Sequence, residues 1–202
     1  MARYTGPKNK LARKVGEDLN LKTNAIKSNK RISIRPGQHG NKGRKKLSGF
    51  GQQLKEKQKL KYVYGVLEKQ LRNLYEVASK NPTATGAALL GLLERRLDNV
   101  VYRLGWVPTR AAARQLVAHG HVVVNDRKVL APSYRVKVKD VIMLRQKATS
   151  IPTVSALLKD EVSNIPTWLK RKGPAGSIER LPERTDIDSN IDEQLIVEFY
   201  SR

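Results

Sequence analysis

Arginine side chains that could bind phosphate recur at helical spacing near the middle of this sequence. Arg110 and Arg114 are four residues apart, so a helix over this stretch places them on one face. Arg95 and Arg96 lie beside a run of apolar residues, and two further cations follow at residues 127–128. A planar guanidinium group can bind two phosphate oxygens at once or stack on an exposed base. The set therefore predicts a nucleic-acid-binding surface.

Two of these positions also allow a structural interpretation. Taken alone, Arg95 could pair with the nearby acid Asp98 and contribute only to the solubility of a helix. His119 and His121 flank Gly120, where an imidazole at a helix C-terminus is the simpler interpretation, because further metal ligands are missing nearby. We therefore predict no metal site.

The remaining candidates for chemistry are open to more than one interpretation. His39 lies in a turn-forming segment, residues 36–40, where a phosphate or base contact and a purely structural turn are both possible. Asp186 and Asp188 could be imagined as a metal pair, although solvated or helix-capping roles are commoner for such acids. The sequence has no P-loop, dinucleotide-binding fingerprint or nucleophile elbow. We therefore predict no enzyme activity, no catalytic residue and no cofactor.

The chain as a whole is strongly basic, and the excess is greatest at its beginning. Its 202 residues include 40 Lys and Arg against 18 Asp and Glu, a formal net charge of +22. Basic and acidic residues number 21 and 5 over residues 1–80, 12 and 4 over 81–150, and 7 and 9 over 151–202. We expect the amino-terminal part to meet a polyanion and the carboxyl-terminal part to face protein.

Composition also excludes several classes of protein. The longest apolar run, residues 87–93, is far shorter than the ~20 residues that span a bilayer, and the first residues have no signal-like apolar stretch. The chain has no cysteine, which excludes disulfides and thiolate-bound zinc. We therefore expect a soluble protein of a cytoplasm-like compartment, with no membrane partner.

Periodic apolar residues predict the helices that position these cations. One apolar stripe spans residues 52–80, where Gly65 can bend or break the helix. A second stripe covers residues 93–105. A third helix begins after Thr109, a plausible N-cap, and stops at Gly120.

Short strands follow these helices. Residues 121–124 and 127–130 flank the turn-forming residues 125–126, and residues 134–139 and 141–144 are the next β-branched or alternating runs. We predict an α+β protein in which a mostly helical part is followed by a module of two short helices and a small antiparallel sheet. A basic, extended N-terminal segment precedes both.

Four segments resemble the small-subunit ribosomal protein S-four family of the bacterial or organellar type. They are ARYTGP at residues 2–7, RPGQHGNKGRKKLSGFGQQLKEKQKLKYVYGVLEKQLRNLY at 35–75, LLERRLDNVVYRLGWVPTRAAARQLVAHGHVVVNDRKV at 92–129 and RLPERTDIDSNIDEQLIVEFYSR at 180–202. The third segment resembles the RNA-binding module named after this family, which several RNA enzymes also carry. Some members hold the N-terminal segment with a cysteine-ligated zinc, which this chain lacks.

The resemblance implies a mostly helical domain with the RNA-binding module inserted as a second domain. It also implies direct binding to small-subunit (16S-type) ribosomal RNA early in assembly, at a helix junction of the 5′ domain. It further implies contact with the neighbouring S-five protein, a boundary tied to translational accuracy, and a place along the messenger RNA entry path. The implied location is the ribosome, in the cytoplasm or in a plastid stroma, and an independent homo-oligomer is not expected. Positions that match the module's usual RNA contacts are Arg95, Arg96, Arg110, Arg114, Gln115, His119 and Asn125. The run that matches the messenger-facing segment is Lys42, Arg44, Lys45 and Lys46.

Other basic, polar and aromatic positions complete the predicted RNA-binding set. They are Arg3, Tyr4, Lys8, Lys10, Arg13, Lys14, Arg35, Gln38, His39, Lys55, Lys59, Lys61, Tyr64, Arg72, Arg127 and Lys128. The predicted organisation is a basic segment ordered by RNA or disordered without it (1–50), a helical domain (51–91), the RNA-binding module (92–150) and a C-terminal segment that packs on the helical domain (151–202).

Two rival functions use the same features. The first is an RNA-modifying enzyme, such as a pseudouridine synthase, that carries the module, but residues 151–202 are too few to supply its catalytic domain. The second is a DNA-compacting protein, which the basic charge allows. Preference for a folded RNA junction over duplex DNA separates the ribosomal interpretation from both.

Overall fold

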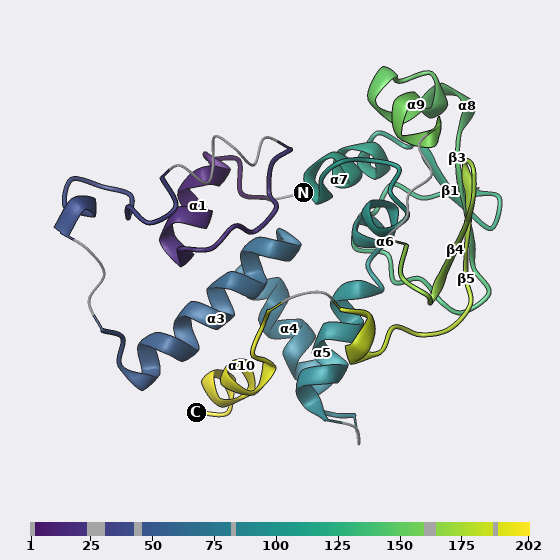
Figure 1. Cartoon of the computed structure of the whole chain (residues 1–202). Helices are drawn as coiled ribbons and strands as arrows, with labels where there is room; N and C mark the ends of the chain where they lie inside the picture. The colour runs from purple at the N-terminus through teal and green to yellow at the C-terminus, as the bar shows by residue number, and fades with distance from the viewer. Residues whose placement is uncertain (1–2, 24–30, 43–45, 82–83, 160–164, 188–189) are drawn as a thin grey trace. The chain divides into compact units, whose positions relative to one another are not determined.

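The computed structural model describes residues 3–23, 31–42, 46–81, 84–159, 165–187 and 190–202 (Figure 1). The chain forms two compact units. Unit 1 comprises residues 1–89 and 189–202, and unit 2 comprises residues 90–188. Within the described residues, no helix is both long and apolar enough to cross a bilayer.

Unit 1 is helical. Its elements are α1 (Lys8–Val15), the 3₁₀ turn η1 (Gly40–Lys42), α3 (Gly49–Tyr64), α4 (Glu68–Ala78) and α10 (Glu193–Tyr200), and α5 (Thr85–Glu94) leads into unit 2. The helix α10 packs along α3 although most of the chain separates them in sequence. Leu60, Leu71 and Ile196 are almost fully buried and fill the space between these helices.

Two features of unit 1 refine the sequence prediction. Gly65 does break the first apolar stripe, because it takes a left-handed conformation (φ 62°) that ends α3 before α4 begins. The N-terminal segment also contains a helix, α1, where we predicted an extended segment. Its apolar residues Ala12 and Val15, with Leu19 beyond it, pack against Val63 of α3.

Unit 2 combines helices with one antiparallel sheet. Its helices are α6 (Leu97–Arg103), α7 (Arg110–Ala118), α8 (Gln146–Thr149) and α9 (Pro152–Lys159), followed by the 3₁₀ turn η2 (Arg184–Asp186). The strands are β1 (Val122–Val124), β2 (Arg127–Lys128), β3 (Val141–Leu144), β4 (Leu169–Lys172) and β5 (Ala175–Ile178). They lie in the order β2-β1-β3-β5-β4, with every neighbouring pair antiparallel. The α+β prediction is confirmed.

The structure divides the chain at different residues from the predicted boundaries. Residues 151–188 belong to unit 2, because β4 and β5 extend the sheet from β3, and Trp168 and Ile178 are buried in the core beside α6. Only residues 189–202 belong to the helical unit. Unit 2 therefore exceeds the predicted 92–150 module by two strands and a helix.

Two expected elements of unit 2 are shorter than predicted. The stripe over residues 93–105 is interrupted, because Arg96 adopts an extended conformation and pairs with Arg135 in an isolated β-bridge. Residues 134–139 do not form the predicted strand beyond this single bridge. Val136, within this stretch, is buried and donates its N–H to the Arg95 carbonyl. The Thr109 N-cap is confirmed, since its hydroxyl accepts a bond from the Ala112 N–H.

Candidate nucleic-acid interface

A buried ion pair joins the start of α6 to α7. The Arg96 guanidinium donates from Nε to Asp98 Oδ1 at 3.1 Å and from Nη2 to Asp98 Oδ2 at 2.7 Å. Arg114 Nη1 lies 3.9 Å from the same Oδ2. All three side chains are buried. The acid near Arg95 therefore binds Arg96 and Arg114, whereas Arg95 donates its Nε to the Val136 carbonyl.

A second buried carboxylate organises the surface beside this pair. Glu94 is 1% exposed, and both of its oxygens accept bonds from Arg103, at 3.0 and 3.1 Å. Asn99 donates to Glu94 Oε2 at 2.6 Å and accepts from Arg110 Nε at 2.7 Å. The Arg110 guanidinium also lies 4.5 Å from the Tyr102 ring centre. Arg110 is thus half-buried and held in place, with part of its side chain open to solvent.

The hairpin after α7 presents cations on a rigid turn. Asn125 and Asp126 have φ values of 47° and 62°, which suits a tight two-residue turn between β1 and β2. The Asn125 side chain donates to Asp140 at 2.8 Å and accepts from the Val141 N–H at 2.9 Å. Asn125 therefore positions the turn, and the exposed residues 127–128 carry its charge.

The end of α7 forms a shallow pocket with α9. A hollow of about 200 Å³ is lined by Gln115, His119 and His121 together with Thr153 and five apolar residues. His119 donates its backbone N–H to the Gln115 carbonyl at the end of the helix. Among the described residues, no group of three His, Asp or Glu side chains could hold a metal ion.

The C-terminal acids have structural roles wherever they are described. Asp186 accepts two bonds from Arg180, both at 2.7 Å, and Asp192 caps α10 by accepting from the Gln194 and Leu195 N–H groups. Asp188 lies outside the described residues. Asp186 therefore takes a structural role, in an ion pair with Arg180.

In unit 1, one arginine shapes the loop that contains His39. Arg13 of α1 donates to the Ile34 carbonyl at 2.9 Å and to the Arg35 carbonyl at 3.1 Å. The loop then turns sharply at Gly40, where a side chain would collide with the Arg35 carbonyl oxygen. Arg13 is thus a positioning residue, and the loop exposes Arg35, Gln38, His39 and Lys42.

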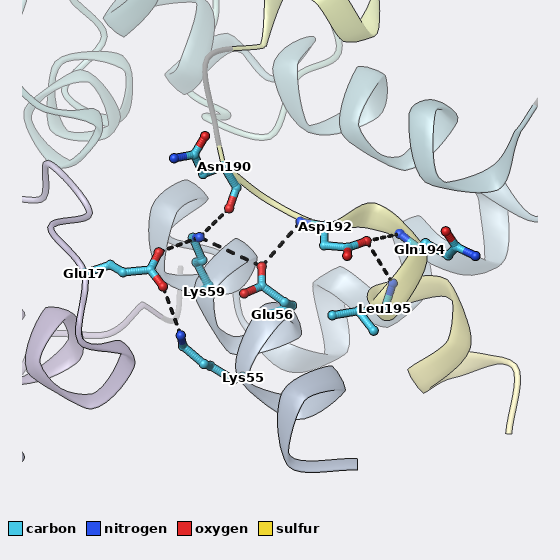
Figure 2. Close-up of polar contacts among 8 residues, drawn as sticks. All are labelled: Glu17, Lys55, Glu56, Lys59, Asn190, Asp192, Gln194 and Leu195. Carbon is cyan, nitrogen blue, oxygen red and sulfur yellow. Dashed lines mark hydrogen bonds and ion pairs between the residues drawn. The ribbon is translucent and has the colours of Figure 1, made fainter. Parts of the chain in front are cut away.

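The lysines of α3 form ion pairs with nearby acids and do not present an uncompensated basic surface. Figure 2 shows the Lys59 ammonium among Glu17, Glu56 and the Asn190 carbonyl, and Lys55 beside the same Glu17. Lys59 lies 2.5 Å from Glu17 and is only 6% exposed. Burial alone raises the pKa of Glu17, but hydrogen bonds from Lys59 and Lys55 outweigh it, so that its pKa falls below the ordinary value.

A second cluster fixes the end of the chain to α3 and α4. The buried Lys57 lies 2.7 Å from Glu68 Oε1 and 4.3 Å from the Phe199 ring centre. The Tyr200 hydroxyl donates to Glu68 at 2.9 Å, and the Tyr200 ring stacks on Tyr75 at 4.8 Å. Burial and then the bond to Glu68 raise the pKa of Tyr200. The carboxyl-terminal helix is therefore held by charge and by aromatic contact.

Acid is expected to weaken this attachment. Burial raises the pKa of Glu68, but hydrogen bonds from Lys57, Tyr200 and Lys61 outweigh it and lower the pKa below 4.5 in the folded state. The carboxylate therefore stabilises unit 1 above its ordinary pKa, and this contribution is lost as the pH falls through the lowered value. Urea unfolding followed by helical circular dichroism should show that Glu68→Gln reduces the loss of stability on acidification. Glu76→Gln, at an exposed acid of the same helix, should leave that loss as in the unchanged chain; equal effects would contradict the assignment.

The predicted RNA-binding residues thus fall into four groups. The buried ones are Lys59, Tyr64, Arg96 and Arg114. The half-buried ones are Lys8, Arg13, Lys55, Lys61, Arg95 and Arg110. The exposed ones are Arg3, Tyr4, Lys10, Lys14, Arg35, Gln38, His39, Lys42, Lys46, Arg72, Gln115, His119, Asn125, Arg127 and Lys128. Arg44 and Lys45 lie outside the described residues.

Comparison with known proteins identifies the family. Residues 3–94 match the Ribosomal protein S4/S9 N-terminal domain, and residues 95–142 match the S4 domain. Small ribosomal subunit protein uS4 of Parabacteroides distasonis is 51% identical over 204 residues, which span 100% of both chains. The uS4 protein of Chloroflexus aurantiacus is 51% identical over 208 residues, again with 100% of each covered. The chain belongs to the uS4 family.

Membership of the uS4 family confirms the resemblance that four sequence segments indicated. The relatives carry the names of ribosomal proteins, which confirms the prediction of a non-enzymatic protein. The S4 domain match ends at residue 142, within β3, whereas unit 2 continues to residue 188. The two strands β4 and β5 therefore lie outside the matched domain and yet complete its sheet.

Proposed function

We propose that this uS4 family member is a structural protein of the small ribosomal subunit that binds small-subunit rRNA directly. Membership of the family and the S4 domain support this role. The observation that carries it is the surplus of exposed cations, in a chain with a formal net charge of +22, together with arginines that the buried residues Asp98, Glu94 and Asn99 hold in fixed positions. Location in a ribosome, in the cytoplasm, follows from that role.

The RNA contacts divide between the two units. In unit 1 the loop shaped by Arg13 presents Arg35, Gln38 and His39 for phosphate or base contact. In unit 2 the half-buried Arg110 and the hairpin cations of residues 127–128 form the contact surface, with Gln115 and His119 at the pocket beside them. Arg96 and Arg114 position neighbouring contact residues and do not bind RNA themselves, because their guanidinium groups form ion pairs with Asp98.

The finer role that we propose has three parts. The protein binds a helix junction of the 5′ domain early and so nucleates its assembly. The segment that contains Lys42 and Lys46, both exposed, lies along the messenger RNA entry path. The near-neutral carboxyl-terminal end meets the S-five protein, at a boundary that affects translational accuracy. The protein acts as one copy in this assembly and not as a separate homo-oligomer.

Competition binding tests this proposal. The full chain is titrated with a 5′-domain fragment of small-subunit rRNA, an unrelated structured RNA and a DNA duplex of matched length at physiological salt. We expect the fragment to bind at least about a hundredfold more tightly than either competitor, a difference of about 2.7 kcal/mol. Equal affinity for all three nucleic acids would show that the chain binds polyanions without preference, and this result would contradict the proposal.

A further inference from the structure

The sheet of unit 2 has a second face, which shares only Lys128 with the RNA contacts proposed above. Residues alternate along its strands, and Val122, Ile142 and Ile178 are buried toward the core that α6 and α7 share. In Figure 1 these helices lie on one side of the strands. The intervening residues, among them Val141 at 41% exposed, form the other face.

One row of paired residues crosses this face over all five strands. The pairs run in order from β2 to β4, namely Lys128 with Val123, Val123 with Met143, Met143 with Ala175, and Ala175 with Lys172. Both end residues are exposed lysines. Neighbouring strands lie about 4.8 Å apart, so the two lysine backbones are separated by about 19 Å. The row is an aliphatic strip with one positive charge at each end.

A neighbouring row adds a hydroxyl and a third lysine. Val141 pairs with Ser177, and Ser177 pairs with Lys170 on the edge strand. Lys170 forms an exposed ion pair with Glu179. Arg171, between the two edge lysines, faces the opposite side and donates to the Leu104 carbonyl. The alternation of β4 therefore directs its lysines, and not its arginine, to the outer face.

We propose that this outer face binds the backbone of double-helical RNA. The inference rests on the proposed rRNA-binding function and extends it to residues 169–178. The two rows, all of whose residues the structure describes, contain three lysines and no acid, which favours a polyanion. The two rows contain no aromatic residue, so splayed bases find no stacking platform there.

The shape of the face fits the minor groove of an A-form helix. That groove is wide and shallow and displays ribose 2′-hydroxyls between two phosphate backbones. The apolar side chains of Val123, Met143 and Ala175 suit contact with riboses, and the Ser177 hydroxyl can bond a 2′-hydroxyl. Lys128 and Lys172, at the two ends of the row, then reach phosphates of opposite strands.

A matched pair of double variants tests the proposal in the full chain. The row variant, Lys170→Gln with Lys172→Gln, removes the two lysines of the edge strand β4 from the outer face, neither of which is among the contacts proposed above. Lys147→Gln with Lys159→Gln removes two exposed charges from α8 and α9 of the same unit. We expect the first pair to weaken binding of the 5′-domain fragment about tenfold and to reduce the salt slope by about 2, because each phosphate contact contributes about 1. The second pair should change the affinity less than about twofold.

Hydroxyl-radical footprinting on the same fragment locates the contact. The row variant should lose backbone protection over one helical segment and keep the rest of the footprint, whereas the control pair should keep all of it. Met143→Glu, which places a carboxylate at the middle of the row, should remove the same protection. Circular dichroism confirms that each variant is folded. The RNA proposal is overturned if the two double variants show the same affinity and footprint and Met143→Glu leaves the footprint intact. A protein neighbour is then the expected partner of this face.

Failure of the proposed function gives a different result. In that case the unchanged chain shows no preference for the rRNA fragment. RNA binding by the sheet face is then measured with a plain RNA duplex of about 16 base pairs, a length that domains recognising duplex shape span. A weaker affinity of the row variant than of the control pair on this duplex supports the face, and equal affinities overturn it.

Discussion

Replacing Asp98 by alanine is expected to lower the free energy of unfolding of unit 2 by about 3–5 kcal/mol. The substitution leaves the buried guanidinium of Arg96 without the two bonds at 3.1 and 2.7 Å that now satisfy it. It also removes the acid beside Arg114, another buried cation. A buried charge that loses its partner keeps the full cost of desolvation, which exceeds the modest net value of the ion pair itself.

Fluorescence-detected urea unfolding measures this effect in unit 2 alone. The chain has two tryptophans, Trp106 and Trp168, and both are buried in the core of unit 2. Asp98→Asn, which keeps the volume and removes the charge, should be strongly destabilising as well. The control is Glu179→Ala, which breaks an exposed ion pair with Lys170 and should cost at most about 1 kcal/mol. If Asp98→Ala and Glu179→Ala lower the free energy of unfolding by similar amounts, burial of the Arg96–Asp98 pair contributes little to the cost of losing it.

Local patterns predicted the helices and turns of unit 2 well. Thr109 can satisfy an orphan N–H group with its hydroxyl, and residues 125–126 tolerate the positive φ of a tight turn. These properties depend on residues at most a few positions apart, so a single sequence contains the whole signal. The same holds for Gly65, whose left-handed conformation separates α3 from α4.

The role of each cation was not predictable in the same way. Lys55, Lys59 and Lys61 of α3 were all predicted to bind RNA, and the sequence alone gives no reason to treat them differently. Burial of Lys59 depends on Glu17 and on the carbonyl of Asn190, which is 131 residues away. A partner so distant leaves no periodic signal in the segment that contains the lysine.

The same reasoning explains why the outer sheet face was not anticipated. Pairing of β5 with β3 joins segments that α8, α9 and β4 separate in the chain, and the amino-acid pattern does not specify this pairing. A local signal did exist, because Gly173-Pro174 is a turn-forming dipeptide and the residues before it alternate between core and surface. That signal would have placed Lys170 and Lys172 on one face of a strand.

Exposed cations should control the salt dependence of rRNA binding, and buried cations should not. The exposed cations among the predicted contacts are Arg3, Lys10, Lys14, Arg35, Lys42, Lys46, Arg72, Arg127 and Lys128. A protein that neutralises about six to ten phosphates loses about 10³–10⁵ in affinity between about 50 and 200 mM salt, because bound counterions are released. We expect a loss in that range for the 5′-domain fragment.

Substitution of one cation of each kind separates binding from folding. Arg35→Gln, on the exposed loop, should reduce the slope of log affinity against log salt by about 1. Lys59→Gln should lower the stability of unit 1 and leave the slope unchanged, because Glu17 and Glu56 already neutralise that ammonium group. Lys55→Gln is the milder counterpart, since Lys55 is half-buried against the same Glu17. Slopes are compared at temperatures where circular dichroism shows all three variants folded. Equal reductions in Arg35→Gln and Lys59→Gln would mean that the ion pairs of α3 open when RNA binds, and that burial in the free protein does not identify its RNA contacts.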